Sequence, residues 1–178
     1  MEKQSLCLEK ARNVRCIVFD VDGVLTDGRI FLGRGGEEEW KTFNVRDGLR
    51  IVMARKRGMK VAFLTGRESE AVSRRAAELS VDRVLQGVKN KAEAMSALLQ
   101  ETGLGPEGIA YLGDDIPDLP AMRAAGFSGA VSDAAPEVLQ ACDWTSPKPG
   151  GKGAAGDFVE FILRSQGLWD EALAGEGG

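Results

Sequence analysis

Short apolar runs along the chain alternate with segments in which apolar residues recur at helical spacing. The runs predict four strands and a weaker fifth, at residues 16–19, 61–64, 109–112, about 128–131 and, more weakly, 81–85. The helical spacing predicts helices over residues 48–56, 68–79, 91–100, 118–125 and about 156–166. Because strands this apolar are buried on both faces, the alternation predicts an α/β fold. We expect a Rossmann-like three-layer sandwich, with a central parallel sheet and helices on both faces.

The segment 29–45 breaks this alternation and predicts a protruding β-hairpin around a glycine-rich turn, Gly33–Gly36. Phe31, Trp40 and Phe43 make the hairpin unusually apolar. An isolated hairpin is only marginally stable in water. We therefore expect it to pack either on a neighbouring subunit or on its own sheet.

The length of 178 residues predicts a single domain spanning residues 1–178, with a flexible tail at about 167–178. A net charge of −4 without a basic run argues against a nucleic-acid partner. The sequence shows neither a signal peptide nor an apolar run near the roughly 20 residues of a membrane span. We expect a cytoplasmic protein without a membrane partner, with its three cysteines reduced.

The absence of histidine narrows the chemistry. It excludes Ser-His and Cys-His nucleophile pairs and zinc bound by histidine. General acid–base chemistry is therefore expected to use Asp, Glu or Lys.

Polar residues follow three of the predicted strands. Asp20 follows the first strand, and Asp22 comes two residues later. Thr65 directly follows the strand at residues 61–64, and Asp114 comes one residue after the end of the strand at residues 109–112. Ligands of parallel sheets gather at the carboxyl ends of the strands, so these side chains are expected to meet. An ionised aspartate there can attack phosphorus without a base. Because carboxylate and phosphate are both negative, the pattern predicts a hard cation, Mg²⁺, between them.

The acidic residues can be given separate roles. Asp20 would be the nucleophile and a metal ligand, and Asp114 a second ligand, supported by Asp115 or Asp118. Asp22 would donate a proton to the departing alcohol and later take one from the attacking water.

The phosphoryl group needs further partners. Thr65 could donate to its oxygens, while Gly66 lets the backbone approach closely. Lys91, at the start of a predicted helix, could neutralise the nucleophile and the phosphoryl group.

Each of these features also has a purely structural interpretation. Acidic pairs are common in loops, and GDDIPD at residues 113–118 could be a turn with a helix N-cap. Lys91 could be a solvated surface charge. The occurrence of all four features in order, three of them at strand ends of one sheet, favours the chemical interpretation.

At these residues the sequence resembles the haloacid dehalogenase superfamily of phosphohydrolases. DVDGVLTDG (residues 20–28) resembles the first motif, LTG the second, Lys91 the third and GDDIPD the fourth. The resemblance implies that Asp20 is the nucleophile, that Asp22 is the acid/base and also binds the metal, and that Asp114 and Asp118 belong to the metal site. The intervals between the motifs are too short for a cap domain, so we expect a capless member.

Further stretches narrow the resemblance. FNVRDG, TGRES, QGVKNK and PGGKGA are similar to the 3-deoxy-D-manno-octulosonate 8-phosphate phosphatase family. This implies a phosphorylated sugar acid as substrate, a place in lipopolysaccharide biosynthesis, and a homotetramer in which the hairpin contacts a neighbour. A substrate carboxylate calls for cations, for which Arg67 and Arg46 are the candidates. Gly156 stands where the family commonly has arginine.

Other functions remain open from the sequence. The enzyme could act on a nine-carbon keto-sugar acid phosphate or another small phosphorylated metabolite. A receiver-like signalling domain also phosphorylates an aspartate, but it has no use for an acid/base at Asp22. A catalytically silent assembly subunit is the third alternative.

Overall fold

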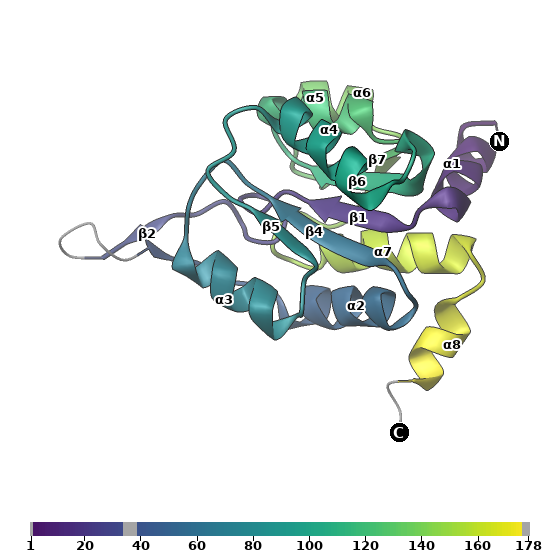
Figure 1. Ribbon diagram of the computed structural model, residues 1–178, viewed down its shortest axis with the longest axis horizontal. Coiled ribbons are helices and arrows are strands. Elements are labelled where there is room, and N and C mark those ends of the chain that lie inside the picture. Colours follow the sequence, from purple (N-terminus) through teal and green to yellow (C-terminus); the bar gives the residue numbers. More distant parts are fainter. Residues whose placement is uncertain (1, 34–38, 176–178) are drawn as a thin grey trace.

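A parallel sheet of six strands forms the centre of the molecule in the computed structural model, which describes residues 2–33 and 39–175 (Figure 1). The strands lie in the order β5, β4, β1, β6, β7, β8, and every neighbouring pair is parallel. They are β1 Cys16–Phe19, β4 Lys60–Leu64, β5 Arg83–Leu85, β6 Ile109–Gly113, β7 Phe127–Ala130 and β8 Trp144–Thr145. The predicted parallel sheet is confirmed.

The four main strand predictions are confirmed to within one residue at each end, and the weaker fifth in part, as β5. The pattern does not predict β8, because two residues are too few to show a period. Tertiary contacts hold this strand instead: the Trp144 ring lies 5.3 Å from that of Phe158 and 5.6 Å from that of Phe161, between centroids.

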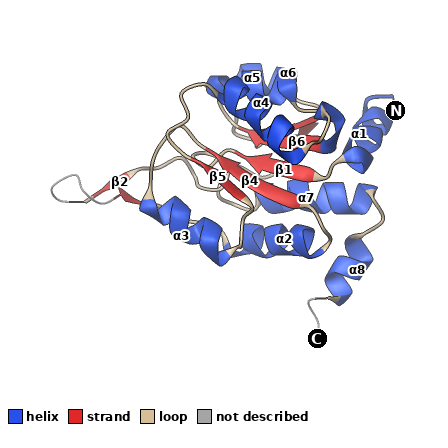
Figure 2. Cartoon of the chain, viewed as in Figure 1, coloured by secondary structure: helices blue, strands red, loops and turns tan. Residues whose placement is uncertain are grey.

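Helices cover both faces of the sheet, which confirms the three layers (Figure 2). On one side α2 packs on α7 and α7 on α1, and on the other α4 packs on α5. The α-helices are α1 Glu2–Asn13, α2 Val45–Lys56, α3 Glu70–Glu78, α4 Lys91–Thr102, α5 Leu119–Ala124, α6 Pro136–Ala141, α7 Ala154–Ser165 and α8 Trp169–Ala174, with 3-10 turns η1 Pro106–Gly108 and η2 Ile116–Asp118. Of the α-helices, α1, α6 and α8 are not predicted from the sequence. The longest described helices have 12 residues, and none is long and apolar enough to cross a bilayer.

No cap domain occurs among the described residues. Between Asp22 and Thr65 the chain forms the hairpin, α2 and β4, and between Thr65 and Lys91 it forms α3 and β5. Within residues 2–33 and 39–175, therefore, no separate domain covers the carboxyl edge of the sheet.

The predicted hairpin is confirmed: β2 Phe31–Leu32 pairs antiparallel with β3 Glu39–Trp40 and projects from the body (Figure 1). The glycine-rich turn expected at residues 33–36 lies, after Gly33, outside the described residues. Phe43 packs against the core of its own chain. Phe31 and Trp40 do not: they are 50% and 63% exposed.

Part of the expected flexible tail is a helix instead. In α8 Trp169 is buried, and the guanidinium carbons of Arg50 and Arg164 lie 5.3 and 4.8 Å from the centre of its ring. The prediction of a flexible segment is therefore wrong for residues 169–174, because this ring docks on α2 and α7. The last residues, 176–178, lie outside the described part of the chain.

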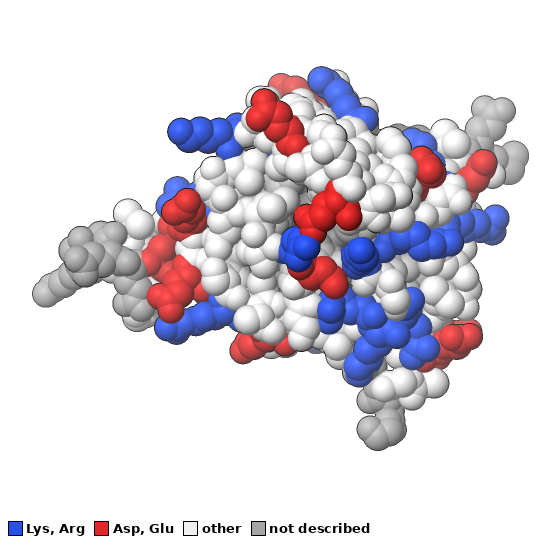
Figure 3. All heavy atoms as spheres, in the orientation of Figure 1, with Lys and Arg blue, Asp and Glu red and all other residues white. Residues whose placement is uncertain are grey.

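Lys and Arg side chains gather at the end of the molecule opposite the hairpin (Figure 3). Arg12 and Arg57 stand at the carboxyl ends of α1 and α2, and Arg12 Nε donates to the Ser165 carbonyl at the end of α7, at 3.2 Å. Cations at these positions offset the negative ends of the helix dipoles. The basic cluster thus has a structural explanation.

Candidate active site

The residues of the proposed reaction centre lie at the carboxyl ends of three adjacent strands. β4, β1 and β6 are neighbours in the sheet, and Thr65, Asp20 and Asp114 follow them directly. Backbone pairing continues beyond the strands: Asp20 N–H donates to the Leu112 carbonyl at 3.0 Å, and Thr65 N–H to the Leu85 carbonyl at 2.9 Å. From β1 the chain passes to β4 on one side and later reaches β6 on the other, so the crevice for a ligand opens here.

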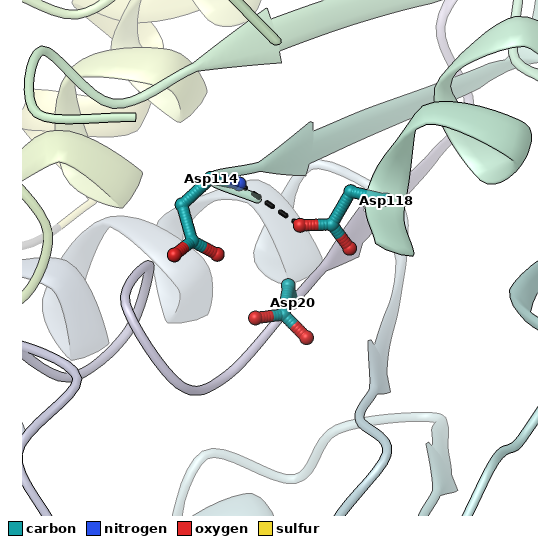
Figure 4. Close-up of side chains that lie close together, drawn as sticks. All are labelled: Asp20, Asp114 and Asp118. Carbon is teal, nitrogen blue, oxygen red and sulfur yellow. Dashed lines mark hydrogen bonds between the residues drawn. The ribbon is translucent and has the colours of Figure 1, made fainter. Parts of the chain in front are cut away.

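Asp20, Asp114 and Asp118 converge from two strand ends and the η2 turn (Figure 4). One carboxylate oxygen of each lies within 4.8 Å of the others. Burial, and then the charge of Asp118, raise the pKa of Asp20 to about 7. Burial and the charges of Asp20 and Asp118 raise the pKa of Asp114 to about 8. Such mutual repulsion is relieved when a cation binds between the carboxylates.

Lys91 balances part of this charge. Its Nζ lies 2.6 Å from Asp20 Oδ1 and 2.6 Å from Asp118 Oδ1. The Asn90 side chain accepts from the N–H groups of Ala92 and Glu93, so α4 begins at Lys91. Burial lowers the pKa of Lys91, but the charges of Asp20 and Asp118 outweigh burial and raise it. The cluster therefore holds three carboxylates against one ammonium, and an all-oxygen donor set of this charge fits a hard divalent cation.

Asp118 holds the backbone of the segment after β6 through hydrogen bonds. Its Oδ2 accepts from the N–H groups of Asp114 and Asp115, at 2.9 and 3.2 Å, and its Oδ1 accepts from the Tyr111 hydroxyl at 2.6 Å. Sequence reasoning missed Tyr111, because a single hydroxyl inside the apolar run IAYL is indistinguishable from a core aromatic. Burial, and then the charge of Asp118, raise the Tyr111 pKa well above its usual value, so it stays a donor.

Asp22 lies beside this cluster and is contacted by the hairpin. Thr65 Oγ1 donates to Asp22 Oδ2 at 3.4 Å, and Lys41 Nζ is ion-paired with Asp22 Oδ1. Glu39 also pairs with Lys41, and its other oxygen pairs with Arg67 Nη2 at 2.5 Å. Sequence reasoning missed Lys41 and Glu39, because the run EEEWK is typical of a solvated hairpin surface.

The carboxylate cluster, Lys91, Asp22, Thr65 and Arg67 line a cleft of about 400 Å³, which Lys41 and Glu39 do not line. Its lining contains most of the residues predicted from the sequence, and adds residues from the loop before α4 and from the segment after β6. The lining residues are Asp20, Asp22, Thr65, Gly66, Arg67, Val88, Lys89, Asn90, Lys91, Asp114, Asp115, Pro117, Asp118 and Pro120.

Gly23 explains part of the first motif. It has a φ of +94°, and a Cβ at this position would lie 2.1 Å from Asp114 Oδ2. The PGG stretch packs against the same loop, since a Cβ at Gly150 would lie 1.7 Å from the Gly23 carbonyl oxygen. These glycines let two loops and the Asp114 carboxylate meet at the carboxylate cluster.

Comparison with known proteins identifies the family. A model of the haloacid dehalogenase-like hydrolases matches residues 35–126, slightly more than half of the chain. The chain belongs to the haloacid dehalogenase-like hydrolase family.

Relatives of this hydrolase match over nearly its whole length. The 3-deoxy-D-manno-octulosonate 8-phosphate phosphatase KdsC of Escherichia coli strain K12 is 43% identical over 165 residues, which cover 93% of this chain and 87% of the relative. The KdsC protein of Haemophilus influenzae is 42% identical over 89% of this chain and 88% of its own length.

Solved structures of the same phosphatase are also similar. The one from Moraxella catarrhalis, a complex with a magnesium ion, a phosphate ion and KDO, has a TM-score of 0.92 and 37% identity, over 95% of this chain and 97% of that chain. The one from Yersinia pestis has a TM-score of 0.90 and 38% identity, over 93% and 89%.

Two predicted site residues of this hydrolase, and the glycine that stands at the family's arginine position, lie apart from the carboxylate cluster. Arg46 is exposed in the first turn of α2 and does not line the cleft. Asp115 lines the cleft but lies outside the three-carboxylate group; its side chain caps the Ile116 N–H at 2.8 Å. Gly156 is buried against α2, where its N–H donates to Asp47 Oδ1 at 2.6 Å.

Proposed function

We propose that this hydrolase is a Mg²⁺-dependent phosphomonoesterase that converts 3-deoxy-D-manno-octulosonate 8-phosphate to the free sugar acid and phosphate. The observation that carries the proposal is the strand-end cluster of Asp20, Asp114 and Asp118 with Lys91 at 2.6 Å from two of them. Relatives of this specificity that match over most of the chain support the substrate.

Asp20, Asp114 and the backbone carbonyl of Asp22 would hold the Mg²⁺ ion, with Asp118 orienting them. When bound, the ion neutralises the carboxylates and the phosphoryl oxygens. Lys91 adds a fixed positive charge beside the nucleophile. Asp115, which caps η2, would support the cluster through the backbone.

The chemistry then follows in two steps. An Asp20 oxygen attacks phosphorus, the bond from phosphorus to the sugar oxygen breaks, and Asp22 gives its proton to that oxygen. In the second step Asp22 takes a proton from a water molecule that attacks phosphorus, and the bond from Asp20 to phosphorus breaks. Thr65 and Gly66 would bind the phosphoryl oxygens, and the restored Asp20 is ready for another turnover.

Arg67 is the candidate for the substrate carboxylate, because it lines the cleft with Thr65 and Gly66. Glu39 holds its guanidinium at 2.5 Å. Guanidinium and carboxylate groups pair with two parallel hydrogen bonds, which suits recognition of a sugar acid. Arg46 remains a second candidate from the sequence, and its exposed position would require a substrate that extends beyond this cleft.

We also propose that the protein is a cytoplasmic homotetramer whose hairpin contacts a neighbouring subunit. Ile30, Phe31, Leu32 and Trp40 are 44%, 50%, 74% and 63% exposed on one short hairpin, which is more apolar surface than a monomer usually leaves in water. Buried, free thiols at Cys16 and Cys142 agree with a reducing compartment.

Phosphate release in the presence of Mg²⁺ tests the function. The panel contains the eight-carbon keto-sugar acid phosphate, a nine-carbon keto-sugar acid phosphate, glucose 6-phosphate and p-nitrophenyl phosphate. We expect kcat/KM to be highest for the eight-carbon acid. A preference for the nine-carbon acid would change the substrate and keep the chemistry, whereas no release from any phosphate would favour a silent assembly subunit.

A further inference from the structure

A second buried lysine lies next to the proposed reaction centre. Lys41 directly follows β3 of the hairpin, yet the exposed fraction of its side chain is 0%. Its Nζ pairs with Asp22 Oδ1 and lies 2.6 Å from Glu39 Oε1, a contact that lacks hydrogen-bond geometry. Together with Arg67 these residues form a chain of alternating charges from the hairpin into the cleft.

Burial of this ammonium has a physical consequence. A charged group is buried only where opposite charges compensate for its lost hydration. Asp22 and Glu39 provide that compensation, and their side chains are only 20% and 13% exposed. Since Lys41 sits on a projecting hairpin, it would otherwise lie in water. The ion pairs thus fix both the base of the hairpin and the Asp22 carboxylate.

The two oxygens of Asp22 have different surroundings. Oδ1 is bound by Lys41, whereas the one hydrogen bond to Oδ2 from the part of the chain that the structure describes is the long contact of 3.4 Å from the Thr65 hydroxyl. We propose that Lys41 is a positioning residue of the reaction, which holds Oδ1 and thereby presents Oδ2 as the oxygen that exchanges the proton. Glu39 keeps Lys41 in place from the other side. This inference rests on the proposed function, in which Asp22 is the acid/base.

The proposal makes the hairpin part of the active site of its own chain. Loss of Lys41 leaves the nucleophile, the carboxylate cluster and Lys91 untouched, because Lys41 contacts none of them through a described ion pair or hydrogen bond. A loose Asp22 slows the chemical step rather than substrate binding. Misplacement of a reacting group by about 1 Å costs on the order of 10²-fold in rate.

The test is a double-mutant cycle of Lys41→Met and Asp22→Asn, measured at saturating Mg²⁺. Lys41→Met is expected to lower kcat about 10²-fold with little change in KM, and Lys41→Arg to restore much of it. All four enzymes are assayed with p-nitrophenyl phosphate, whose leaving group needs no proton, so that Asp22 acts there only as the base that takes a proton from water in the second step. In the Asp22→Asn background Lys41→Met is expected to have almost no further effect.

Lys10→Met is the matched control, because it removes an ion pair of 2.5 Å to Asp143 far from the cleft. An equal loss in both backgrounds, a change confined to KM, or an unchanged Lys41→Met enzyme would overturn the proposal. Circular dichroism checks folding, and an active Lys41→Arg enzyme keeps the test valid if Lys41→Met unfolds. A wild-type chain that hydrolyses only p-nitrophenyl phosphate would refute the proposed substrate and not this inference; one inactive on both would overturn both.

Discussion

Two buried lysines stand at the proposed active site, each between two carboxylates, and their backbone support differs. Lys91 opens the 12-residue helix α4 and pairs with Asp20 and Asp118. Lys41 follows a two-residue strand of the hairpin and pairs with Asp22 and Glu39. The ion pairs of Lys91 join elements that the hydrophobic core already holds. The ion pair of Lys41 with Asp22, by contrast, itself attaches a projecting segment to the core.

The two lysines serve separate tasks. Lys91, on our proposal, acts on the nucleophile Asp20 and on the carboxylate cluster, whose geometry follows from adjacent strands. Lys41, on our proposal, acts on the proton donor Asp22, whose geometry depends on the ion pairs of Lys41 with Asp22 and Glu39. We therefore expect substitutions on the Lys91 side to affect both metal binding and turnover, and those on the Lys41 side to affect turnover alone.

The largest effect is expected for Asp20→Asn, because an amide cannot form the acyl phosphate. Phosphate release should fall by at least about 10⁴-fold, in a range typical for loss of a nucleophile. Asp115→Asn is the control: it lies in the same cleft, outside the three-carboxylate group, and asparagine keeps a helix cap. Turnover by Asp20→Asn close to that of Asp115→Asn would exclude the covalent mechanism.

A second prediction sets the two lysines side by side. Lys91→Met should lower kcat by about 10²- to 10³-fold, as for other preorganised electrostatic donors. It should also enlarge the stabilisation of the fold by Mg²⁺, since Asp20 and Asp118 lose their cation. Lys41→Met should leave that stabilisation unchanged. Thermal unfolding with and without Mg²⁺ measures the stabilisation of each variant. An equal gain in Tm for the two variants would contradict the proposed difference between Lys91 and Lys41.

The sequence predicts the Lys91 side well because local rules suffice there. Apolar runs mark β1, β4 and β6, and parallel strands bring their carboxyl ends together, so the strand pattern alone predicts that Asp20, Thr65 and Asp114 meet. The bounds of β1 are predicted without error. The helix carrying Lys91 is predicted to begin at the residue where α4 begins.

The Lys41 side could not be predicted in the same way. Nothing in EEEWK tells which charged residue turns inward, because a hairpin of two-residue strands carries almost no periodic signal. The docking of Trp169 in α8 and the hydroxyl bond of Tyr111 escape prediction for a related reason: each depends on tertiary packing that no local pattern encodes. Arg46, chosen by its place in a motif, lies outside the cleft.

The carboxylate cluster should make the stability of the fold depend on pH. Since folding raises the pKa of Asp20 to about 7 and that of Asp114 to about 8, these two carboxyls bind more protons in the metal-free native state than in the unfolded chain between about pH 4 and about pH 8. Their contribution to the stability of the metal-free protein should fall as the pH rises through that window. Mg²⁺ favours the ionised carboxylates, so the gain in Tm on adding Mg²⁺ should widen with pH.

The size of this gain can be bounded. A ligand at about 100 times its Kd stabilises a protein by about 2.7 kcal/mol, which corresponds to about 5–10 °C in Tm for a chain of this size. Scans with Mg²⁺ and with a chelator at about pH 5 and about pH 8.5 measure it. Asp114→Asn should flatten the difference between the two pH values. A gain that is equal at both pH values in the wild type would contradict the coupling of the cluster to a cation.

The smallest effect on the fold is expected on the outer face of the hairpin. Trp40 lies between Glu39 and Lys41 in sequence, but it is 63% exposed. Trp40→Ser should shift the protein toward smaller species in light scattering and leave the Tm of the dissociated subunit nearly unchanged. Leu6→Ser, at a residue 51% exposed on α1, is the control.

The activity of the dissociated Trp40→Ser protein then sharpens the comparison of the two lysines. If it keeps its kcat, the ion pairs of Lys41 hold Asp22 without help from a neighbour, and the hairpin's inner and outer faces act independently. If the dissociated protein has a lower kcat and adding Lys41→Met causes no further loss, contact with the neighbouring subunit is what holds Lys41 against Asp22. An unchanged oligomer would remove the hairpin from the interface.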